Sequence, residues 1–157
     1  MKIELYGIDK ELQETIHLER FESRGSKGYN YSVHNALTGV IGYVEVRLKD
    51  IDWFVDREEP VADILGRLVL EDETIAEIQR FYPHKEPLKI RIPSEVLRRG
   101  VGTGVLQTVV ADLRGERIRH FYCFNPAEDF YRILLKQRFR ELHAGDTNEH
   151  LFRRFRV

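Results

Sequence analysis

The chain has 157 residues, 42% of them hydrophobic and 32% charged, with a net charge of −1. This length suits one domain with its own core, and the near-neutral charge gives no indication of a nucleic-acid partner. A single cysteine excludes an internal disulfide framework and a cysteine-based zinc cluster. No apolar run reaches membrane-spanning length and no signal segment opens the chain, so we expect a cytoplasmic protein without a membrane partner.

The first sixty residues predict a β meander. Residues 2–8 alternate as a strand does, and residues 29–36 and 40–48 predict a hairpin. Residues 11–21 leave helix and strand open, because the spacing of their apolar positions satisfies both periods. The aromatic run at 53–55 is expected to continue the sheet.

Residues 61–87 are expected to form a helical insert. Residues 60–70 give no clear periodicity, whereas Ile75, Ile78 and Phe81 predict a helix over 72–82. Between positions 41 and 80 there are eleven acidic and five basic residues, a net charge of −6. This segment would attract a cationic amine, although a solvated acidic face is the commoner explanation for such a charge balance.

A glycine-rich segment follows the short β-like run at residues 89–92. It contains Arg98, Arg99, Gly100, Gly102 and Gly104 and leads into an apolar helical run. A strand, a glycine turn and a helix together present free backbone N–H groups to a phosphate. Neither the Walker A pattern nor the G-x-G-x-x-G dinucleotide pattern is present. A tight turn without a ligand is the alternative.

The second half predicts a strand, a helix and a hairpin in that order. Residues 118–124 read as a buried strand that contains Cys123. Asn125, Pro126 and Glu128 then match the N-cap, N1 and N3 positions of a helix that runs to about residue 137. Residues 138–142 predict a further strand.

A final hairpin is predicted to turn at residues 145–148 and to end in a strand over 151–157. Arg153, Arg154 and Arg156 fall on this last strand. Charge that protects a sheet edge explains these arginines, and contact with RNA or an acidic partner is the alternative. The six histidines show no metal-ligand spacing, so no metal site is predicted.

The glycine-rich segment and the later strand-helix segment that contains Asn125 resemble motifs A and B of the GCN5-related N-acetyltransferase (GNAT) superfamily. Motif A reads Arg/Gln-x-x-Gly-x-Gly/Ala. Placing its glycines on Gly100 and Gly102 puts Leu97 at the Arg/Gln position, whereas Arg99, Gly102 and Gly104 match it fully. We favour the first register, because the residues after it fit the family better, with Arg98 or Arg99 supplying the charge.

Motif B places an asparagine at the end of the fifth strand, then a helix with Phe-Tyr, then Gly-Phe. Asn125 and the pair Phe130-Tyr131 match it, and Arg138-Phe139 stands where the family has Gly-Phe. The resemblance covers roughly residues 88–142.

The resemblance implies an α+β or mixed α/β fold of the acyl-CoA N-acyltransferase type. Its sheet is mostly antiparallel with one parallel strand pair, and helices flank it. We expect one domain, divided into a meander (1–60), a helical insert (61–87), a cofactor-binding core (88–142) and a C-terminal hairpin (143–157). The first half departs from the family, which has two helices between its first two strands.

The resemblance also implies an activity. It predicts transfer of an acetyl group from acetyl-CoA to a primary amine on a small molecule or a peptide. Tyr131 takes the position of the general acid. Glu45, on a predicted strand, is the candidate base. The residues expected to contact acetyl-CoA are Ile90, Ile92, Leu97, Arg98, Arg99, Gly100, Val101, Gly102, Thr103 and Asn125.

Two other interpretations stay open. The chain could be a non-catalytic protein of the same fold that binds CoA or a protein partner, or a nucleotide-binding module that uses the same glycine turn. Members of the family often pair through sheet edges, which makes a homodimer an expectation here as well.

Overall fold

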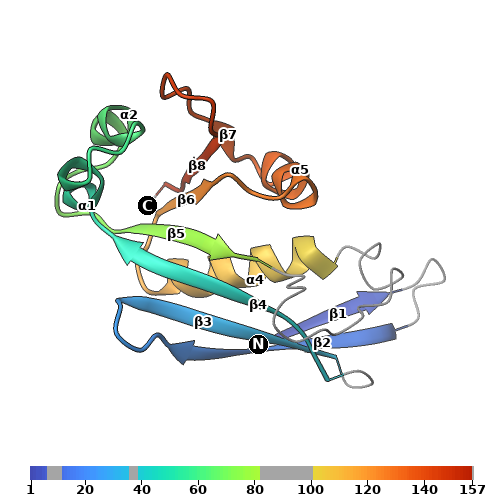
Figure 1. Cartoon of the computed structure of the whole chain (residues 1–157). Helices are drawn as coiled ribbons and strands as arrows, with labels where there is room; N and C mark the ends of the chain where they lie inside the picture. The colour runs from blue at the N-terminus through green and yellow to red at the C-terminus, as the bar shows by residue number, and fades with distance from the viewer. Residues whose placement is uncertain (7–11, 36–38, 82–100, 157) are drawn as a thin grey trace.

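A single mixed sheet organises the computed structural model, which describes residues 1–6, 12–35, 39–81 and 101–156 (Figure 1). Its eight strands follow the order β1-β2-β3-β4-β5-β6-β8-β7. Within these residues every neighbouring pair is antiparallel except β5 and β6. The strands are β1 (Lys2–Tyr6), β2 (Leu12–Glu22), β3 (Gly28–Asn35), β4 (Gly39–Lys49), β5 (Ile75–Arg80), β6 (His120–Phe124), β7 (Arg140–Glu141) and β8 (His150–Arg154).

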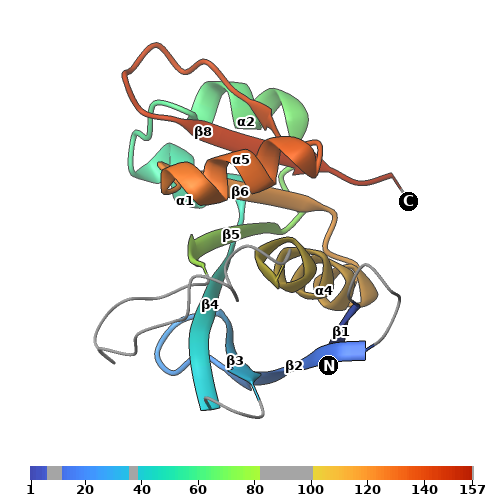
Figure 2. The ribbon, with the colours of Figure 1, turned by 90° about the vertical axis from the view of Figure 1, so that its right-hand side faces the viewer.

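Helices cover both faces of the sheet (Figure 2). The described helices are α1 (Ile51–Asp56), α2 (Ala62–Leu68), α4 (Val101–Gly115) and α5 (Glu128–Lys136). Buried residues of α4 and α5 share one apolar cluster with β2, β3 and β4. Buried residues of α1 and α2 form a second cluster with Ile75, Tyr122 and Phe152. The sheet therefore separates two cores.

The N-terminal meander is confirmed, and the ambiguous segment after it is a strand. β2 pairs with β1 on one side and with β3 on the other. Ile16 and Leu18 are both buried, which is the period-two pattern of a strand with one face in the core. Pairing on both sides decides the conformation that the residue spacing left open.

The expectation that residues 53–55 continue the sheet is wrong. They belong to α1, whose N-cap is Asp50, and the Asp50 carboxylate accepts a hydrogen bond from the backbone N of Trp53 at 3.0 Å. An N-cap aspartate satisfies a helical N–H that would otherwise lack a partner. A local cap therefore outweighs the β propensity of the aromatic residues.

The helix predicted over residues 72–82 is also wrong, because Ile75–Arg80 forms strand β5. Ala76 and Ile78 lie in the core beneath α4, and Ile75 lies in the cluster on the opposite face. Ile75 and Ile78 are three residues apart, which suits a helix, but alternation across two buried faces explains the segment better. The expected helical insert at 61–87 thus contains the short helix α2 and a central strand, and residues 82–87 lie outside the described residues.

The C-terminal half follows the predicted order. β6, α5, β7 and β8 succeed one another, and β8 pairs with β6 on one side and with β7 on the other. The last strand, β8, lies inside the strand order, but β7 pairs with it only at Leu151 and Phe152. Arg153 and Arg154 lie beyond that pairing, so charge that protects a sheet edge stays an explanation for these two arginines.

Candidate active site

The parallel pair β5 and β6 holds together over only three rungs. Ile75, Ala76 and Glu77 pair with His120, Phe121 and Tyr122, and the register ends there. β5 continues to Arg80 beside β4, with a bulge opposite Glu45 and Val46. Beyond the third rung the two strands diverge, so backbone donors and acceptors on their C-terminal halves no longer pair with each other. Such an opening in a sheet can accept an extended ligand arm.

Helix α4 supplies a second element of the site. It includes Val101, Gly102, Thr103 and Gly104, which were predicted as part of the glycine turn. A Cβ on Gly102 would stand 2.8 Å from Ile133 Cδ1, and one on Gly104 would stand 3.0 Å from Ile3 Cγ2. These two glycines therefore allow α4 to pack closely against α5 and β1.

The remaining cofactor residues of the glycine segment, Leu97, Arg98, Arg99 and Gly100, lie outside the described residues, as do Ile90 and Ile92. The strand beside β6 among the described residues is β5, which forms from a segment that was predicted to be helical.

Helix α5 carries Tyr131 and packs against the residue that follows β5. The preceding residue, Phe130, stacks on Phe81 with ring centroids 3.8 Å apart, and Phe81 directly follows β5. The half-buried Tyr131 hydroxyl donates a hydrogen bond to Glu141 Oε2 at 3.1 Å. This bond is the main cause that raises the pKa of Tyr131 above its ordinary value. The phenol accordingly keeps its proton, as a proton donor must.

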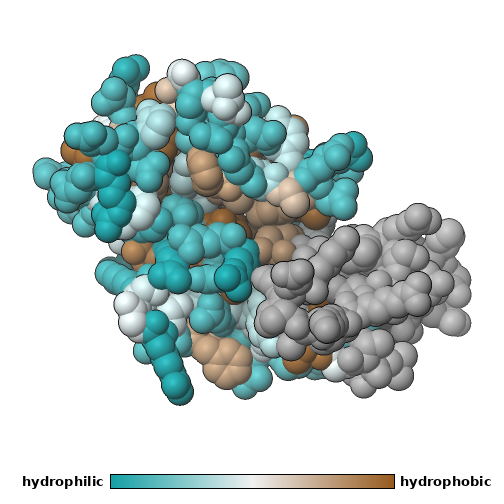
Figure 3. Space-filling view, viewed as in Figure 1, coloured by the Kyte–Doolittle hydropathy of each residue, from teal (hydrophilic) through white to brown (hydrophobic). Residues whose placement is uncertain are grey.

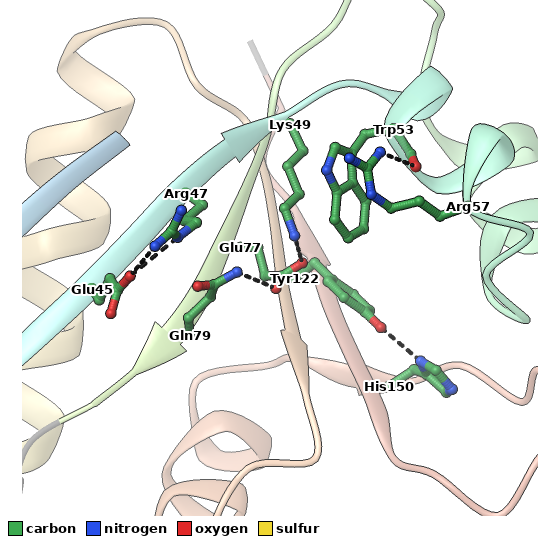
Figure 4. A network of polar contacts seen from close by, with 9 residues as sticks. All are labelled: Glu45, Arg47, Lys49, Trp53, Arg57, Glu77, Gln79, Tyr122 and His150. Atoms are coloured by element: carbon green, nitrogen blue, oxygen red, sulfur yellow. Dashed lines mark hydrogen bonds and ion pairs between the residues drawn. The ribbon is translucent and has the colours of Figure 1, made fainter. Parts of the chain in front are cut away.

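Glu45 lies on β4 opposite Arg80, beside the diverging half of β5. Its carboxylate accepts hydrogen bonds from Arg47 Nη2 at 2.8 Å and Nε at 3.1 Å. Arg80 Nε is 3.3 Å from the other carboxylate oxygen. Two guanidinium groups therefore hold the candidate base in place, and Figure 4 shows the bonds from Arg47.

Glu77 is a second carboxylate on this face that the sequence reasoning missed. It sits on the last rung of the parallel pair, opposite Tyr122. Its carboxylate accepts hydrogen bonds from Lys49 Nζ and from Gln79 Nε2, both at 2.9 Å (Figure 4). The alternation of Ile75, Glu77 and Gln79 was visible in the sequence, but a helical interpretation of residues 72–82 places these residues on different faces.

Trp53 contacts the cationic side chains at the α1 end of the polar network that includes Lys49 and Glu77. Lys49 Nζ lies 3.3 Å from the centre of the indole ring, and the Arg57 guanidinium lies 4.3 Å from it (Figure 4). Cations over an indole face are attracted by its quadrupole. Helix α1 is in this way connected to β4 and, through Lys49, to Glu77.

A buried hydrogen-bonded chain connects β6 and β8 to the turn before β8. The Tyr122 hydroxyl and His150 Nδ1 are 2.7 Å apart, and His150 Nε2 is 3.0 Å from Asp146. Burial raises the pKa of Tyr122 above its ordinary value. The chain anchors the turn that packs beside α1 and α2, since Ala144 contacts the same apolar cluster as those helices.

Asn125 does not cap α5, which corrects the predicted helix start. The N-cap is Ala127, and no side chain caps it. Asn125 takes a positive φ of 45° at the end of β6. Its amide bonds Asn148 Oδ1 at 2.9 Å and accepts from the backbone N of Glu149 at 2.7 Å. The residue therefore ties the end of β6 to the turn before β8.

Other predicted features lie away from reactive chemistry. Cys123 is buried as expected, and burial raises the pKa of its thiol to about 12. In the described ranges no three His, Cys, Asp or Glu side chains gather as metal ligands do. None of the helices that the structure describes combines the length and hydropathy of a membrane-spanning helix. The face in Figure 3 is mostly hydrophilic.

The helices α1 and α2 stand in an unusual place for the family that the motifs resemble. They connect β4 to β5, whereas the family has two helices between its first two strands. Here β1, β2, β3 and β4 follow one another as antiparallel neighbours. Two helices therefore precede the central strand β5 here, instead of following the first strand.

Comparisons with known proteins give similarity at the level of structure. No family model matches the sequence, and no curated protein matches it. The solved structure of NAA60 from Arabidopsis thaliana in complex with acetyl-CoA matches with a TM-score of 0.55 and 12% identity, over 89% of this chain and 97% of that one. FeeM, an N-acyl amino acid synthase from uncultured soil microbes, matches with a TM-score of 0.45 and 14% identity, over 85% and 73% of the two chains.

The likeness to NAA60 agrees with the topology described above. A mixed sheet with one parallel pair, flanked by four described helices, is the arrangement of the acyl-CoA N-acyltransferase fold. The fold class expected from the two motifs is confirmed: the chain has a GNAT-like fold.

Proposed function

We propose that the protein is an acyltransferase that moves an acetyl group from acetyl-CoA to a primary amine. The observation that carries this proposal is the divergence of β5 and β6 after three rungs, with α4 and the Tyr131-bearing helix α5 packed beside it. NAA60, whose fold is similar, was solved in complex with acetyl-CoA. The NAA60 complex supports acetyl-CoA as the donor.

The residues present fit an extended thioester ligand. The C-terminal half of β5 has backbone groups that do not pair with β6, and they are available to bond the pantetheine arm. The segment with Leu97, Arg98, Arg99 and Gly100, which immediately precedes α4, remains the proposed phosphate contact. Ile90, Ile92, Val101, Gly102, Thr103 and Asn125 stay in the proposed donor site, and Asn125 would act there by shaping the end of β6.

The chemistry requires one proton to be removed and one to be supplied. The neutral amine nitrogen bonds to the thioester carbon, the carbon–sulfur bond breaks, and the sulfur leaves as a thiolate. Tyr131 gives that thiolate a proton from its phenol, which is protonated at neutral pH. Glu45 accepts the proton that the amine loses, with Glu77 as the second carboxylate on the same strand pair.

Ligand binding is tested first by thermal unfolding with acetyl-CoA, free CoA and ATP. A ligand present at about a hundred times its Kd stabilises a protein by about 2.7 kcal/mol, which raises the Tm by several degrees at this size. We expect both CoA compounds to raise the Tm and ATP to leave it unchanged. Equal shifts with ATP would favour a nucleotide-binding module, and no shift with any compound would contradict the proposal.

Turnover is tested with the Tyr131→Phe variant. We expect kcat for acetyl transfer to a panel of primary amines to fall by about 10²-fold or more, because general acid catalysis is lost. The acetyl-CoA-dependent Tm shift should remain, because the ring is retained. Glu141→Gln is the matched control, since it keeps the phenol and changes only its partner. Binding without turnover in the unaltered protein would instead identify a non-catalytic CoA-binding protein.

The acidic segment at 41–80 supports a cationic acceptor. Asp52, Asp56 and Asp63 on or beside α1 and α2 are exposed near the face that carries Glu45 and Glu77. A field of this sign attracts protonated amines and weakens as salt is added. Cytoplasmic location and a homodimer remain predictions, to be tested by cell fractionation and by light scattering.

A further inference from the structure

A second recess lies at the end of the sheet opposite the diverging strands. It has a volume of about 480 Å³, and four arginines line it together with Glu73 and Phe155: Arg67, Arg119, Arg154 and Arg156. Arg67 is on α2, Arg119 precedes β6, and Arg154 and Arg156 are at the end of the chain. β5 and β6 begin here and diverge at their other end. The recess is therefore separate from the candidate active site.

The single carboxylate in the recess is already neutralised. Glu73 is ion-paired with Arg119, lies 2.7 Å from His120 Nε2, and accepts a bond from the backbone N of Leu70 at 3.1 Å. These contacts outweigh burial and lower the pKa of Glu73 to about 2. Glu73 consequently has little capacity to balance the other three arginines.

Arg67, Arg154 and Arg156 are exposed, and no carboxylate of the described residues pairs with them. Arg154 donates a hydrogen bond to the backbone oxygen of Leu68, at 3.2 Å. Three guanidinium groups, one from α2 and two from the C-terminal segment, thus line one recess without an ion pair to any described carboxylate. The like charges of these arginines repel one another, and a bound anion would reduce this repulsion.

The surroundings select a compact anion. Guanidinium groups bind phosphate oxygens through paired hydrogen bonds, and a recess of this size accommodates a small ligand or one modified side chain. Glu71 and Asp72 are exposed on the turn next to the recess. An extended polyanion such as nucleic acid would meet these carboxylates, whereas a single phosphate group would not. Leu70, which is 68% exposed, adds an apolar wall.

We propose that this arginine recess binds a phosphate monoester at a site distinct from the acyl-transfer site. Neither the fold nor the proposed reaction requires such a site. It would add recognition of a phosphorylated small molecule or of a phosphorylated side chain to the activity proposed above.

The first experiment measures inorganic phosphate binding by calorimetry at constant ionic strength. We expect the Kd to rise about tenfold or more in the triple variant Arg67→Gln, Arg154→Gln, Arg156→Gln, since charge-assisted bonds to the anion are lost. The matched control is Arg24→Gln, Arg132→Gln, Arg140→Gln, which removes the same charge from exposed positions elsewhere. Equal affinities in the two triple variants, or no binding by the unaltered protein, would overturn the proposal.

A second comparison separates this site from the donor site. Arg98→Gln, Arg99→Gln should leave phosphate affinity unchanged, while the recess variant should keep any Tm shift produced by acetyl-CoA. Loss of phosphate binding in the Arg98, Arg99 variant would assign the anion to the donor site and refute the recess. Failure of acetyl-CoA to bind would count against the proposed function only.

The source of the phosphate is identified by competition. Glucose 6-phosphate represents a free metabolite, and a phosphoserine peptide represents a modified protein. Displacement of phosphate from the unaltered protein by one of these compounds supports the proposal and identifies that compound's class as the source. The recess variant should show no such displacement. Binding of a short RNA that needs the same three arginines, without displacement by either phosphate monoester, would contradict it.

Discussion

Arg138 shows how one residue can hold a backbone conformation that glycine would adopt more easily. The resemblance expects glycine at this position, and the structure gives Arg138 a φ of 65°. An L-residue in the left-handed region costs about 1 kcal/mol or more, because its Cβ approaches the backbone. The sequence alone showed that arginine replaces the expected glycine. The positive φ explains why a glycine would suit this position.

We predict that Arg138→Gly raises the free energy of unfolding by about 0.5–1 kcal/mol, as relief of strain exceeds the entropy that glycine adds to the unfolded chain. Urea denaturation measures the effect. Arg138→Ala is the control, since it removes the same charge and leaves a side chain at the positive φ. That charge matters because burial, and after it Arg138, lowers the pKa of Arg153. If Ala stabilises as much as Gly, charge and not strain is responsible.

Asn125 was predicted at the right position for the wrong reason. Asparagine followed by proline reads as a helix start, but the Asn125 side chain bonds to the turn before β8, which is more than twenty residues away in sequence. Capping is a local interaction and can be read from neighbours. The contact that forms instead depends on β6 and β8 already being paired.

At the scale of elements, β5 decides where the candidate site lies. It pairs with β4 on one side and with β6 on the other, and only this double pairing makes a strand of residues whose spacing also suits a helix. This double pairing makes Ile75–Arg80 the strand beside β6, whereas the strand predicted at residues 89–92 lies outside the described residues. It also placed Glu77 beside Tyr122, which no local pattern could indicate.

Glu73 joins the starts of β5 and β6 and makes their packing sensitive to acid. Its pKa is lowered to about 2, because bonds from His120, Arg119 and the Leu70 backbone outweigh burial. A carboxylate with a depressed pKa stabilises the fold above its ordinary pKa and loses this effect as pH falls. The stabilisation should therefore decline from about pH 4.5 to about pH 2.

We predict that the difference in unfolding free energy between the unaltered protein and Glu73→Gln shrinks over that pH range. Urea titrations at several pH values measure it. Glu58→Gln serves as control, because Glu58 is an exposed carboxylate for which the structure gives no ion pair. A difference that stays constant down to pH 2 would show that Glu73 is not held as described.

At the scale of the whole molecule, one sheet connects two cores on its opposite faces. Ile75 and Tyr122 contribute to the cluster beneath α1 and α2, while their neighbours Ala76 and Phe121 contribute to the other. Because β5, β6 and β8 contribute buried residues to both cores, neither layer is expected to unfold alone.

We predict a single cooperative unfolding transition. The fluorescence of Trp53, the only tryptophan, reports on the α1 side, and far-UV circular dichroism reports on the whole chain. Their thermal transitions should coincide, with equal calorimetric and van't Hoff enthalpies. A Trp53 transition at lower temperature would show instead that the layer of α1 and α2 unfolds separately.

Much of the fold could be predicted from local patterns. Period-two alternation predicted the hairpin of β3 and β4, and the order of β6, α5, β7 and β8 followed from turns and apolar runs. The two motifs that resemble the GNAT family pointed to the correct fold class. These features depend on residues close together in the chain, where sequence spacing and backbone geometry are directly coupled.

Tertiary structure alone decided the features that depend on distant pairing. It made Ile75–Arg80 a strand, set Glu77 opposite Tyr122 and held Glu45 between Arg47 and Arg80. It also collected in one recess three arginines that pair with no described carboxylate. The physical reason is that a pairing partner and a buried face are properties of the assembled sheet. A segment whose own periodicity permits two conformations takes the one that satisfies its backbone hydrogen bonds against its neighbours.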